Sequence, residues 1–320
     1  MKELRREIPI FFTIDDNYAP FLAVALRSLV RHASCKRTYR AIVLHQGLNE
    51  ENIIKLKSLE VDNVKIELLP MRENFLKLED RIENRLRCDY FTLTIYFRLF
   101  IPEMFVEYDK GIYIDSDVVL TTDISKLYDI DLGDNYIGAC PDYSISTTPE
   151  IVDYTIRAVG VKKGEYINSG VLLMNLKKMR DEGFEKHFLD LLNTYHFDSI
   201  APDQDYLNAI CNGKILYLDQ RWNSMPNYDL EPFSNTFLVH YNLFKKPWCY
   251  SGVQYEDVFW LNALECPYYN KLLDLRESYT EEKKQNDEKC FQMLMDRGQE
   301  IIDKDITFSK LHKSGVRIRL

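Results

Sequence analysis

The apolar and polar positions along this chain alternate between two periods. Residues 8–14 form a continuous apolar run of strand length, whereas the apolar positions of residues 18–33 recur at helical spacing. The order then repeats, because residues 39–44 and 64–69 predict strands on either side of a helix at 49–59. This alternation predicts a layered α/β fold with a mostly parallel central sheet.

The pattern continues into the second half of the chain. Further strands are predicted at residues 112–120, 136–140, 171–174, 215–218 and 237–241, with a helix at 176–195. We expect residues 1–265 to form one α/β domain. Residues 266–320 become densely charged and end in a basic segment with interspersed apolar residues, which predicts a helical appendage. The appendage is either a solvated helix or a contact for an anionic membrane surface.

Composition excludes several classes of protein. The 320 residues are 46% hydrophobic, enough for a large core, and the formal net charge of −9 argues against nucleic acid as a partner. The seven cysteines are scattered, without a Cys-x-x-Cys pair, which favours a reducing cytoplasm. No window approaches the roughly 18 apolar residues of a membrane span. We therefore expect a cytoplasmic protein that is at most peripherally attached to the inner face of a membrane.

Two carboxylates interrupt the apolar run at 112–120. Asp115 and Asp117 would point the same way from a strand that continued straight through them, so that both could bind one hard divalent cation. The chain has three other Asp-x-Asp sequences, at 129–131, 203–205 and 303–305, which are typical of a turn, a helix start and a charged surface respectively. Only the copy at 115–117 ends a strand-like run.

Other polar clusters are predicted at strand ends. Asp15, Asp16 and Asn17 follow the first strand, Asp142 follows the strand at 136–140, and residues 168–170 precede the strand at 171–174. Since ligands of parallel α/β sheets bind at the carboxyl ends of strands, one cleft can collect these groups together with Asp115.

Seven segments, in order along the chain, carry a family resemblance. They are Phe12-Thr-Ile-Asp-Asp-Asn-Tyr18, Thr94-Ile-Tyr-Phe-Arg-Leu99, Ile112 to Val119, Gly138-Ala-Cys-Pro-Asp142, Asn168-Ser-Gly-Val-Leu-Leu-Met-Asn175, Asp203-Gln-Asp205, and His240-Tyr241 followed by Lys246-Pro-Trp248. With these segments residues 8–248 resemble the retaining glycosyltransferases of family 8, which include bacterial lipooligosaccharide galactosyltransferases and glycogenin. The resemblance implies a GT-A fold, a UDP-sugar donor, a divalent metal and retention at the anomeric carbon.

The resemblance also assigns metal ligands. Asp115, Asp117 and His240 match the family's ligand positions, and the nitrogen ligand favours Mn²⁺ over Mg²⁺. Without the flanking motif, a lone histidine in an apolar strand would be interpreted as a core residue.

The nucleotide-binding positions fall at the first strand and at the Asp-x-Asp sequence. Asp15 and Asn17 match positions that bind uracil, and Ser116 matches a donor-binding position. Asp15 and its neighbours can also cap the helix that follows, and the two roles are compatible.

The donor sugar is expected to bind a third group, comprising Arg98, Asp142, Asn168, Asp203 and Gln204. Alternatively, Asp203 is only a helix cap. Gln204 matches a position near the β-face of the anomeric carbon, but an amide oxygen is a weak nucleophile. We therefore favour front-face attack, with Gln204 stabilising oxocarbenium character.

Lys246 matches a lysine that binds the diphosphate, where positive charge offsets charge growing on the leaving group. Lys245 is an adjacent alternative. Leu243 stands where the family's usual pattern has glycine, which changes the expected path of this loop.

Together these residues predict a metal-dependent retaining enzyme that transfers galactose or glucose from a UDP-sugar to a glycan or glycolipid hydroxyl, with Gln204, Asp203 and Lys246 as its catalytic residues. The alternatives are a catalytically idle UDP-sugar-binding or scaffold protein and a sugar-phosphate nucleotidyltransferase. The sequence does not favour a nucleotidyltransferase, because no Gly-rich basic loop that could hold a triphosphate follows the first strand. The segment 72–90 and the loop after His240 are candidates for closing over the donor.

Overall fold

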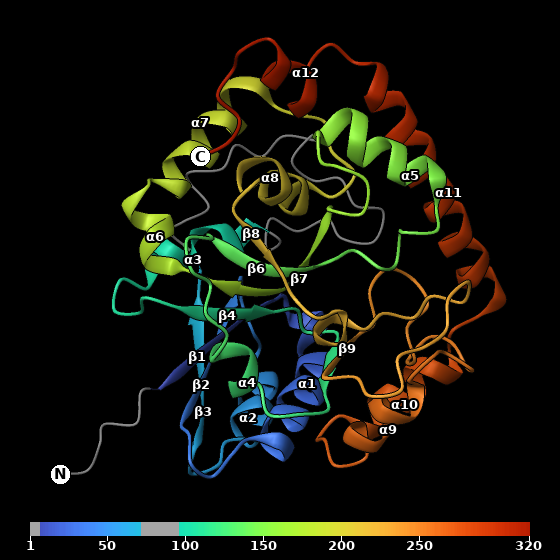
Figure 1. Ribbon diagram of the computed structural model, residues 1–320. Coiled ribbons are helices and arrows are strands. Elements are labelled where there is room, and N and C mark those ends of the chain that lie inside the picture. Colours follow the sequence, from blue (N-terminus) through green and yellow to red (C-terminus); the bar gives the residue numbers. More distant parts are fainter. Residues whose placement is uncertain (1–6, 72–95) are drawn as a thin grey trace.

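A computed structural model of the chain describes residues 7–71 and 96–320 (Figure 1). The candidate closing segment at 72–90 lies outside the described residues. The centre of the fold is a seven-stranded sheet of order β3-β2-β1-β4-β7-β6-β8. Its strands are β1 (Ile8–Ile14), β2 (Tyr39–His45), β3 (Val64–Pro70), β4 (Gly111–Ile114), β6 (Ile137–Pro141), β7 (Ile167–Met174) and β8 (Ile215–Tyr217).

Most pairings in this sheet are parallel, as the alternation of strands and helices predicted. The pairs β1–β2, β2–β3, β1–β4 and β6–β8 are parallel, whereas β7 runs antiparallel to both β4 and β6. The direction of β7 matters for the site. Its first residues lie at the edge where β4 and β6 end, with Ile167 opposite Pro141 and Val171 opposite Ile114.

The helices cover both faces of the sheet. Around one core cluster lie α3 (Phe97–Met104), α5 (Pro149–Tyr154), α6 (Leu176–Asp181), α7 (Phe184–Tyr195) and α8 (Pro202–Ile210). Around the other lie α1 (Ala19–His32), α2 (Glu50–Lys57), α4 (Ser125–Tyr128), α9 (Glu256–Ala263) and α10 (Tyr269–Glu277). Short helical segments add Asp16–Tyr18, Thr155–Val159 and Gln220–Asn223.

The alternation of side chains along β1 explains the two clusters. Phe11 belongs to one cluster, while its neighbours Ile10 and Phe12 belong to the other, and all three are fully buried. Successive side chains of a strand point to opposite faces, so a central strand must be apolar throughout. This is why residues 8–14 form a continuous apolar run.

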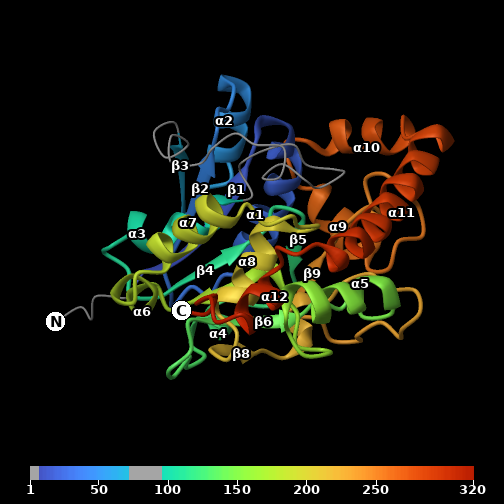
Figure 2. The same ribbon diagram turned by 90° about the horizontal axis from the view of Figure 1, so that it is seen from above.

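The C-terminal helices pack against the same protein core. They are α11 (Glu281–Asp303) and α12 (Phe308–Lys313), and Figure 2 shows α10 and α11 at the end of the molecule opposite α3 and α6. Ile301, Ile302, Phe308 and Ile318 are buried in the cluster that contains α7 and α8. The basic residues of the tail remain on the surface. Among the described residues, no helix is long and apolar enough to cross a membrane.

The predicted strand at 112–120 is wrong in one respect. It is two strands, because β4 ends at Ile114 and β5 (Val118–Leu120) belongs to a separate two-stranded sheet with β9 (Leu238–His240). Asp115 and Asp117 therefore lie in the connection between two sheets, so their side chains converge through a turn.

Two other boundaries differ from expectation. The predicted helix at 176–195 is interrupted at Gly183, whose φ of 74° is left-handed and favours glycine. Asn168, Ser169 and Gly170 do not precede the strand that follows them but lie within β7.

Candidate metal centre and active site

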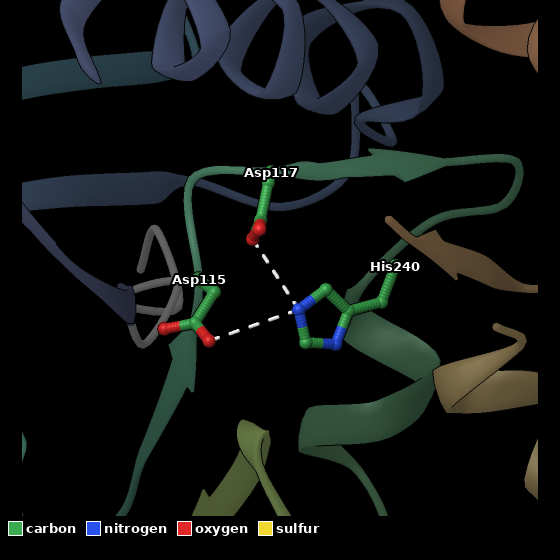
Figure 3. Close-up of side chains that lie close together, drawn as sticks. All are labelled: Asp115, Asp117 and His240. Carbon is green, nitrogen blue, oxygen red and sulfur yellow. Dashed lines mark ion pairs between the residues drawn. The ribbon is translucent and has the colours of Figure 1, made fainter. Parts of the chain in front are cut away.

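Three side chains from two segments, the connection between β4 and β5 and the strand β9, converge at the end of β4 (Figure 3). The His240 Nε2 atom lies 3.3 Å from Asp117 Oδ1 and 3.8 Å from Asp115 Oδ2. One ligand atom from each of the three residues lies within 4.8 Å of the others. The pairing of Val118 with His240 in the small sheet brings β9 to the turn between the aspartates. The structure thus brings together the three side chains that the sequence predicts to be metal ligands.

Backbone hydrogen bonds fix this turn at both ends. The Asp115 N–H donates to the Gly170 carbonyl at 2.8 Å, and the Tyr241 N–H donates to the Asp117 carbonyl at 2.9 Å. The turn is thereby attached to β7 on one side and to the end of β9 on the other. Ser116, between the two aspartates, is buried.

In each carboxylate, one oxygen is held by cationic or hydroxyl donors and the other faces the histidine. Asp115 Oδ1 accepts from the Tyr113 hydroxyl at 2.6 Å and lies 3.0 Å from Arg98 Nη2. Asp117 Oδ2 accepts from Lys246 Nζ at 2.6 Å. The remaining oxygens, Asp115 Oδ2 and Asp117 Oδ1, are those nearest His240 Nε2. The arrangement orients one oxygen of each aspartate toward a common point.

The environment of Asp117 favours its ionised form. Burial alone would raise the pKa of this carboxyl, but the adjacent Lys246 ammonium is the largest opposing effect, and the pKa is held well below its usual range. Asp117 is therefore ionised at neutral pH, which is the form that a metal ligand requires.

These residues fit a divalent cation. His240 is 1% exposed, and its Nε2 has no hydrogen-bond partner among the described residues. A buried polar atom without a partner is costly unless another ligand satisfies it. Two carboxylate oxygens and an imidazole nitrogen suit Mn²⁺, and they also accept Mg²⁺.

Gly170 allows these ligands to come together. A Cβ atom built on Gly170 would lie 2.3 Å from His240 Cε1 and 2.6 Å from Asp115 Oδ2. Neither distance is tolerated by a real side chain, so only glycine fits between the two ligands. In the sequence, Gly170 belongs to a family motif and to the polar cluster at 168–170, but neither predicts this steric role.

A cluster of buried polar side chains adjoins the candidate metal ligands. Arg98 Nε lies 3.1 Å from Asp203 Oδ2, and the same guanidinium donates to the Ser169 carbonyl at 2.7 Å. Gln204 donates to Asp142 Oδ2 at 3.0 Å and accepts from the Ser169 N–H at 2.9 Å. Asp203 therefore bonds to Arg98 and Ser169, and it does not act as the side-chain cap of α8.

Asn168 and Asn223 connect this cluster to His240. Asn168 Nδ2 donates to Asp142 Oδ2 at 3.0 Å, and Asn223 Nδ2 donates to Asn168 Oδ1 at 3.0 Å. The Oδ1 atom of Asn223 lies 3.0 Å from His240 Nδ1. The expected sugar-binding residues and the expected metal ligands are thus parts of one hydrogen-bonded network.

Asp205 stabilises the first turn of α8 through hydrogen bonds to buried hydroxyl groups. The carboxylate is fully buried and accepts from the Tyr154 hydroxyl at 2.5 Å, from the Tyr166 hydroxyl at 2.6 Å and from Ser199 Oγ. Burial raises the pKa of Asp205 to about 6, against the opposing effect of these hydroxyl donors. These bonds hold the helix turn that carries Asp203 and Gln204.

The predicted uracil-binding residues lie at the end of β1, next to β4 in the sheet. Asp15 caps the helical turn that follows, because its Oδ1 accepts from the Asn17 and Tyr18 N–H groups. Asp16 instead binds Asn49 and Asn52 of the neighbouring helix. The expected cap is confirmed, and Asp15 Oδ2 makes neither of these capping bonds.

The two candidate lysines differ clearly. Lys246 is buried and donates to Asp117 and to the Tyr241 carbonyl, whereas Lys245 is exposed, with its Nζ 4.8 Å from the ring centroid of Tyr228. Leu243 has a φ of 60°, the left-handed conformation that glycine adopts without strain. A leucine thus occupies a backbone conformation that favours glycine.

Four contributors to the site carried no recognisable signal as single residues: Tyr113, Gly170, Asp205 and Asn223. Asn223 in particular stands in the sequence Arg-Trp-Asn-Ser without charge pattern or periodicity. Its place beside His240 depends on the packing of residues 220–223 against β9. Tertiary structure alone reveals it.

Comparison with known proteins agrees with this geometry. A family model described as Glycosyl transferase family 8 matches residues 9–252. A Haemophilus influenzae protein, whose name assigns it only provisionally as a glycosyltransferase, is 32% identical over 219 residues, covering 68% of this chain and 63% of its own length. The lipopolysaccharide 1,2-glucosyltransferase of Escherichia coli is 25% identical, over 77% of this chain and 75% of its own. The chain thus spans less than two thirds of the first of these relatives.

Solved structures share the fold. The galactosyltransferase LgtC, in complex with donor and acceptor sugar analogs, is 26% identical with a TM-score of 0.64, covering 88% of this chain and all of its own. An active-site mutant of LgtC, in which glutamate replaces a glutamine, gives 28% identity and a TM-score of 0.67 over 81% of this chain and 96% of its own. The α/β architecture with an antiparallel strand near its middle is therefore that of GT-A glycosyltransferases.

Proposed function

The chain belongs to glycosyltransferase family 8, and from that premise we propose that it transfers galactose or glucose from a UDP-sugar to a hydroxyl of a glycan or glycolipid acceptor. The proposal includes retention of anomeric configuration and dependence on Mn²⁺ or Mg²⁺. One observation carries it: three candidate metal-ligand atoms converge beside a buried cluster of hydrogen-bonding side chains.

In this proposal Asp115, Asp117 and His240 hold the metal. When bound, the cation supplies Lewis-acid stabilisation of the negative charge on the departing diphosphate. Arg98 balances part of the negative charge of Asp115, and Lys246 balances that of Asp117, so the site is not repulsive before the cation binds.

The nucleotide would bind along the ends of β1 and β4. Asp15 Oδ2 can accept the uracil N3–H while Oδ1 continues to cap its helical turn, and the exposed Asn17 amide can donate to a ring carbonyl. Ser116, in the turn between the metal-binding aspartates, is the third nucleotide contact we propose.

The donor sugar would bind beside Arg98, Asp142, Asn168, Asp203 and Gln204. Each sugar hydroxyl both donates and accepts, so neighbouring carboxylates, amides and a guanidinium can satisfy several hydroxyls at once. Because these side chains already bond to one another, their positions are fixed before the sugar arrives.

For the chemical step we favour front-face attack. The bond between the anomeric carbon and the diphosphate oxygen breaks, and the acceptor oxygen forms its bond from the same side, while its proton passes to the departing phosphate. The Gln204 carboxamide, held between Ser169 and Asp142, stabilises the positive charge that develops at the anomeric carbon. Asp203 orients Arg98, and the Lys246 ammonium is near enough to the metal ligands to offset leaving-group charge.

The relatives support this choice of substrates. The Escherichia coli relative is named for glucosyl transfer to lipopolysaccharide, and LgtC is named a galactosyltransferase. We further propose that residues 1–265 are the transferase domain and residues 266–320 an appendage. Its exposed basic residues would be available to an anionic membrane surface, since its apolar residues Phe308 and Ile318 are buried.

The experiment that tests this function is a screen of UDP-sugars for Mn²⁺-dependent release of UDP. Asp117→Ala should abolish release. Asp131→Ala, from the exposed Asp-x-Asp copy at 129–131, is the matched control and should retain it. UDP release that needs no metal and persists in the Asp117→Ala variant would contradict the proposal. Metal-dependent UDP binding without turnover of any donor would instead identify an idle binding protein.

A further inference from the structure

A chain of hydrogen bonds with fixed donors and acceptors ends at the inner nitrogen of His240. At the start of this chain, Asn168 has two partners whose roles are fixed. The Gly170 backbone N–H can only donate, and it bonds to Asn168 Oδ1 at 2.9 Å. A carboxylate oxygen is an acceptor, and Asp142 Oδ2 receives Asn168 Nδ2 at 3.0 Å. Both bonds give the Asn168 amide the same orientation, with Oδ1 toward Gly170.

The orientation of Asn168 determines that of Asn223. Asn168 Oδ1 also accepts a bond of 3.0 Å from Asn223, and since that oxygen cannot donate, the Asn223 amide must present its NH₂ group to it. The carbonyl oxygen of Asn223 is left facing His240 Nδ1 at 3.0 Å. An acceptor at this position requires that Nδ1 carry a proton.

The imidazole proton therefore lies on the side away from the aspartates. In a neutral ring with hydrogen on Nδ1, the lone pair is on Nε2, which faces Asp115 Oδ2 and Asp117 Oδ1. A neutral nitrogen with a free lone pair is what a metal ligand must offer, and the partner of the other ring nitrogen commonly sets this tautomer.

We propose that Asn223 is a positioning residue of the metal centre, which holds His240 in the Nδ1–H tautomer with Nε2 directed at the cation. Asn223 is fully buried and lies in the short helical segment Gln220–Asn223. Its side chain is uncharged, and its hydrogen bonds within the described part of the chain are to Asn168 and His240, not to Asp115 or Asp117. The inference rests on the proposed function only in that the ligand of this centre is a divalent metal.

The same residue joins His240 to the side chains proposed to bind the donor sugar. Through Asn168 and Asp142, the Asn223 amide is continuous with Gln204, which bonds to the same Asp142 oxygen. A carboxylate at position 223 would still accept from Nδ1 but could not donate to Asn168. The two functions of Asn223 can thus be separated by one substitution.

The test uses Asn223→Leu, Asn223→Asp and the control Asn262→Leu. Asn262 is as deeply buried but lies in α9, where it bonds to the Val258 carbonyl of its own helix. Two properties are measured on the full chain without sugar nucleotide. They are the tautomer of His240, from ¹⁵N chemical shifts of the metal-free protein at a pH where the ring is neutral, and Mn²⁺ affinity, from titration by electron paramagnetic resonance.

Asn223→Leu should shift His240 away from the Nδ1–H tautomer and weaken Mn²⁺ binding by about tenfold or more. Asn223→Asp should keep the tautomer and bind Mn²⁺ at near wild-type strength, while turnover of the donor falls because the bond to Asn168 is lost. Asn262→Leu should change neither property. If Asn223→Leu does not fold, Asn223→Ala replaces it with the same expected results.

An Nε2–H tautomer in the wild-type protein would overturn the inference, as would an Asn223→Leu variant with unchanged tautomer and Mn²⁺ affinity. Failure of the proposed function gives a different result. In that case the wild-type protein shows the Nδ1–H tautomer and its loss in Asn223→Leu, but no UDP-sugar is turned over.

Discussion

Lys246 Nζ donates a 2.6 Å hydrogen bond to Asp117 Oδ2, the carboxylate oxygen on the side away from His240. A lysine expected at the diphosphate is therefore bonded to a predicted metal ligand. The ammonium both orients the ligand and reduces the negative charge that a cation would meet.

Replacing Lys246 by Met keeps the aliphatic stem and removes this charge. We expect Mn²⁺ to bind the free protein more tightly, by about threefold or more, because Asp117 loses a competing cation. Sugar transfer should slow by about 100-fold, because the charge that offsets the leaving group is gone. Calorimetric titration with Mn²⁺ and an assay of UDP release measure the two effects. Lys245→Met, at the exposed neighbouring position, is the control and should change neither. Weaker Mn²⁺ binding with normal transfer would contradict this account of Lys246.

Replacing Gly170 by Ala should disrupt the metal centre directly. The added Cβ would lie 2.3 Å from His240 Cε1 and 2.6 Å from Asp115 Oδ2, so at least one ligand must move. Mn²⁺ affinity should fall by about tenfold or more. At Gly298, within α11, the nearest atom to an added Cβ is 3.6 Å away, so Gly298→Ala should leave Mn²⁺ binding unchanged and raise the stability of the helix. Equal Mn²⁺ affinity of Gly170→Ala and wild type would show that the space between the ligands is not critical.

Gln204 should matter for turnover more than for nucleotide binding. Gln204→Ala removes the carboxamide that bonds to Ser169 and Asp142, and we expect the turnover number to fall by roughly 100-fold. The affinity for UDP with Mn²⁺ should remain close to that of wild type, because Gln204 is assigned to the sugar. Steady-state kinetics and calorimetry with UDP separate the two quantities. A large loss of UDP affinity would refute the assignment.

Asp205 should give the free energy of unfolding a distinctive pH dependence. Burial raises the pKa of Asp205 from 3.8 to about 6, so the folded protein holds this proton more tightly than the unfolded chain. The resulting stabilisation is fully present below about pH 4, decreases as the pH rises toward 6 and is lost above it; its size is roughly 3 kcal/mol. Asp205→Asn cannot titrate. The difference in unfolding free energy between wild type and this variant should therefore change by that order between pH 4 and 7 in urea titrations, and a constant difference would exclude the effect.

Local sequence determined the first half of the fold well. In residues 8–70 the apolar residues of each strand and helix have the run length or the spacing that is typical of that element. The observed elements agree with the expected ones within a few residues. The break between Ile114 and Val118 was not predictable in this way, because both flanking strands are fully buried and apolar. Their assignment to different sheets depends on pairing with β7 and β9, which lie far away in the sequence. The break at Gly183 did have a local signal, since glycine disfavours a helix interior.

The residues of the site were likewise predictable from the sequence only in part. Asp115, Asp117 and His240 were identified because charged and imidazole groups are unusual in apolar strands and because the motifs around them resemble a family. Neither signal identifies Asn223. Its neutral amide acts only through Asn168 and His240, which are 55 and 17 residues away in the sequence. Leu243 departs from the family's usual glycine, and its φ of 60° places a leucine in a backbone conformation that favours glycine.

The central claim is that Asp115, Asp117 and His240 together bind the metal that enables UDP to leave. The most direct measurement is anomalous diffraction from crystals of the protein soaked with MnCl₂ and UDP, recorded at the manganese absorption edge. The account predicts one manganese peak in bonding contact with Asp115 Oδ2, Asp117 Oδ1 and His240 Nε2. A peak elsewhere, or no peak among these three atoms at saturating manganese, would contradict it.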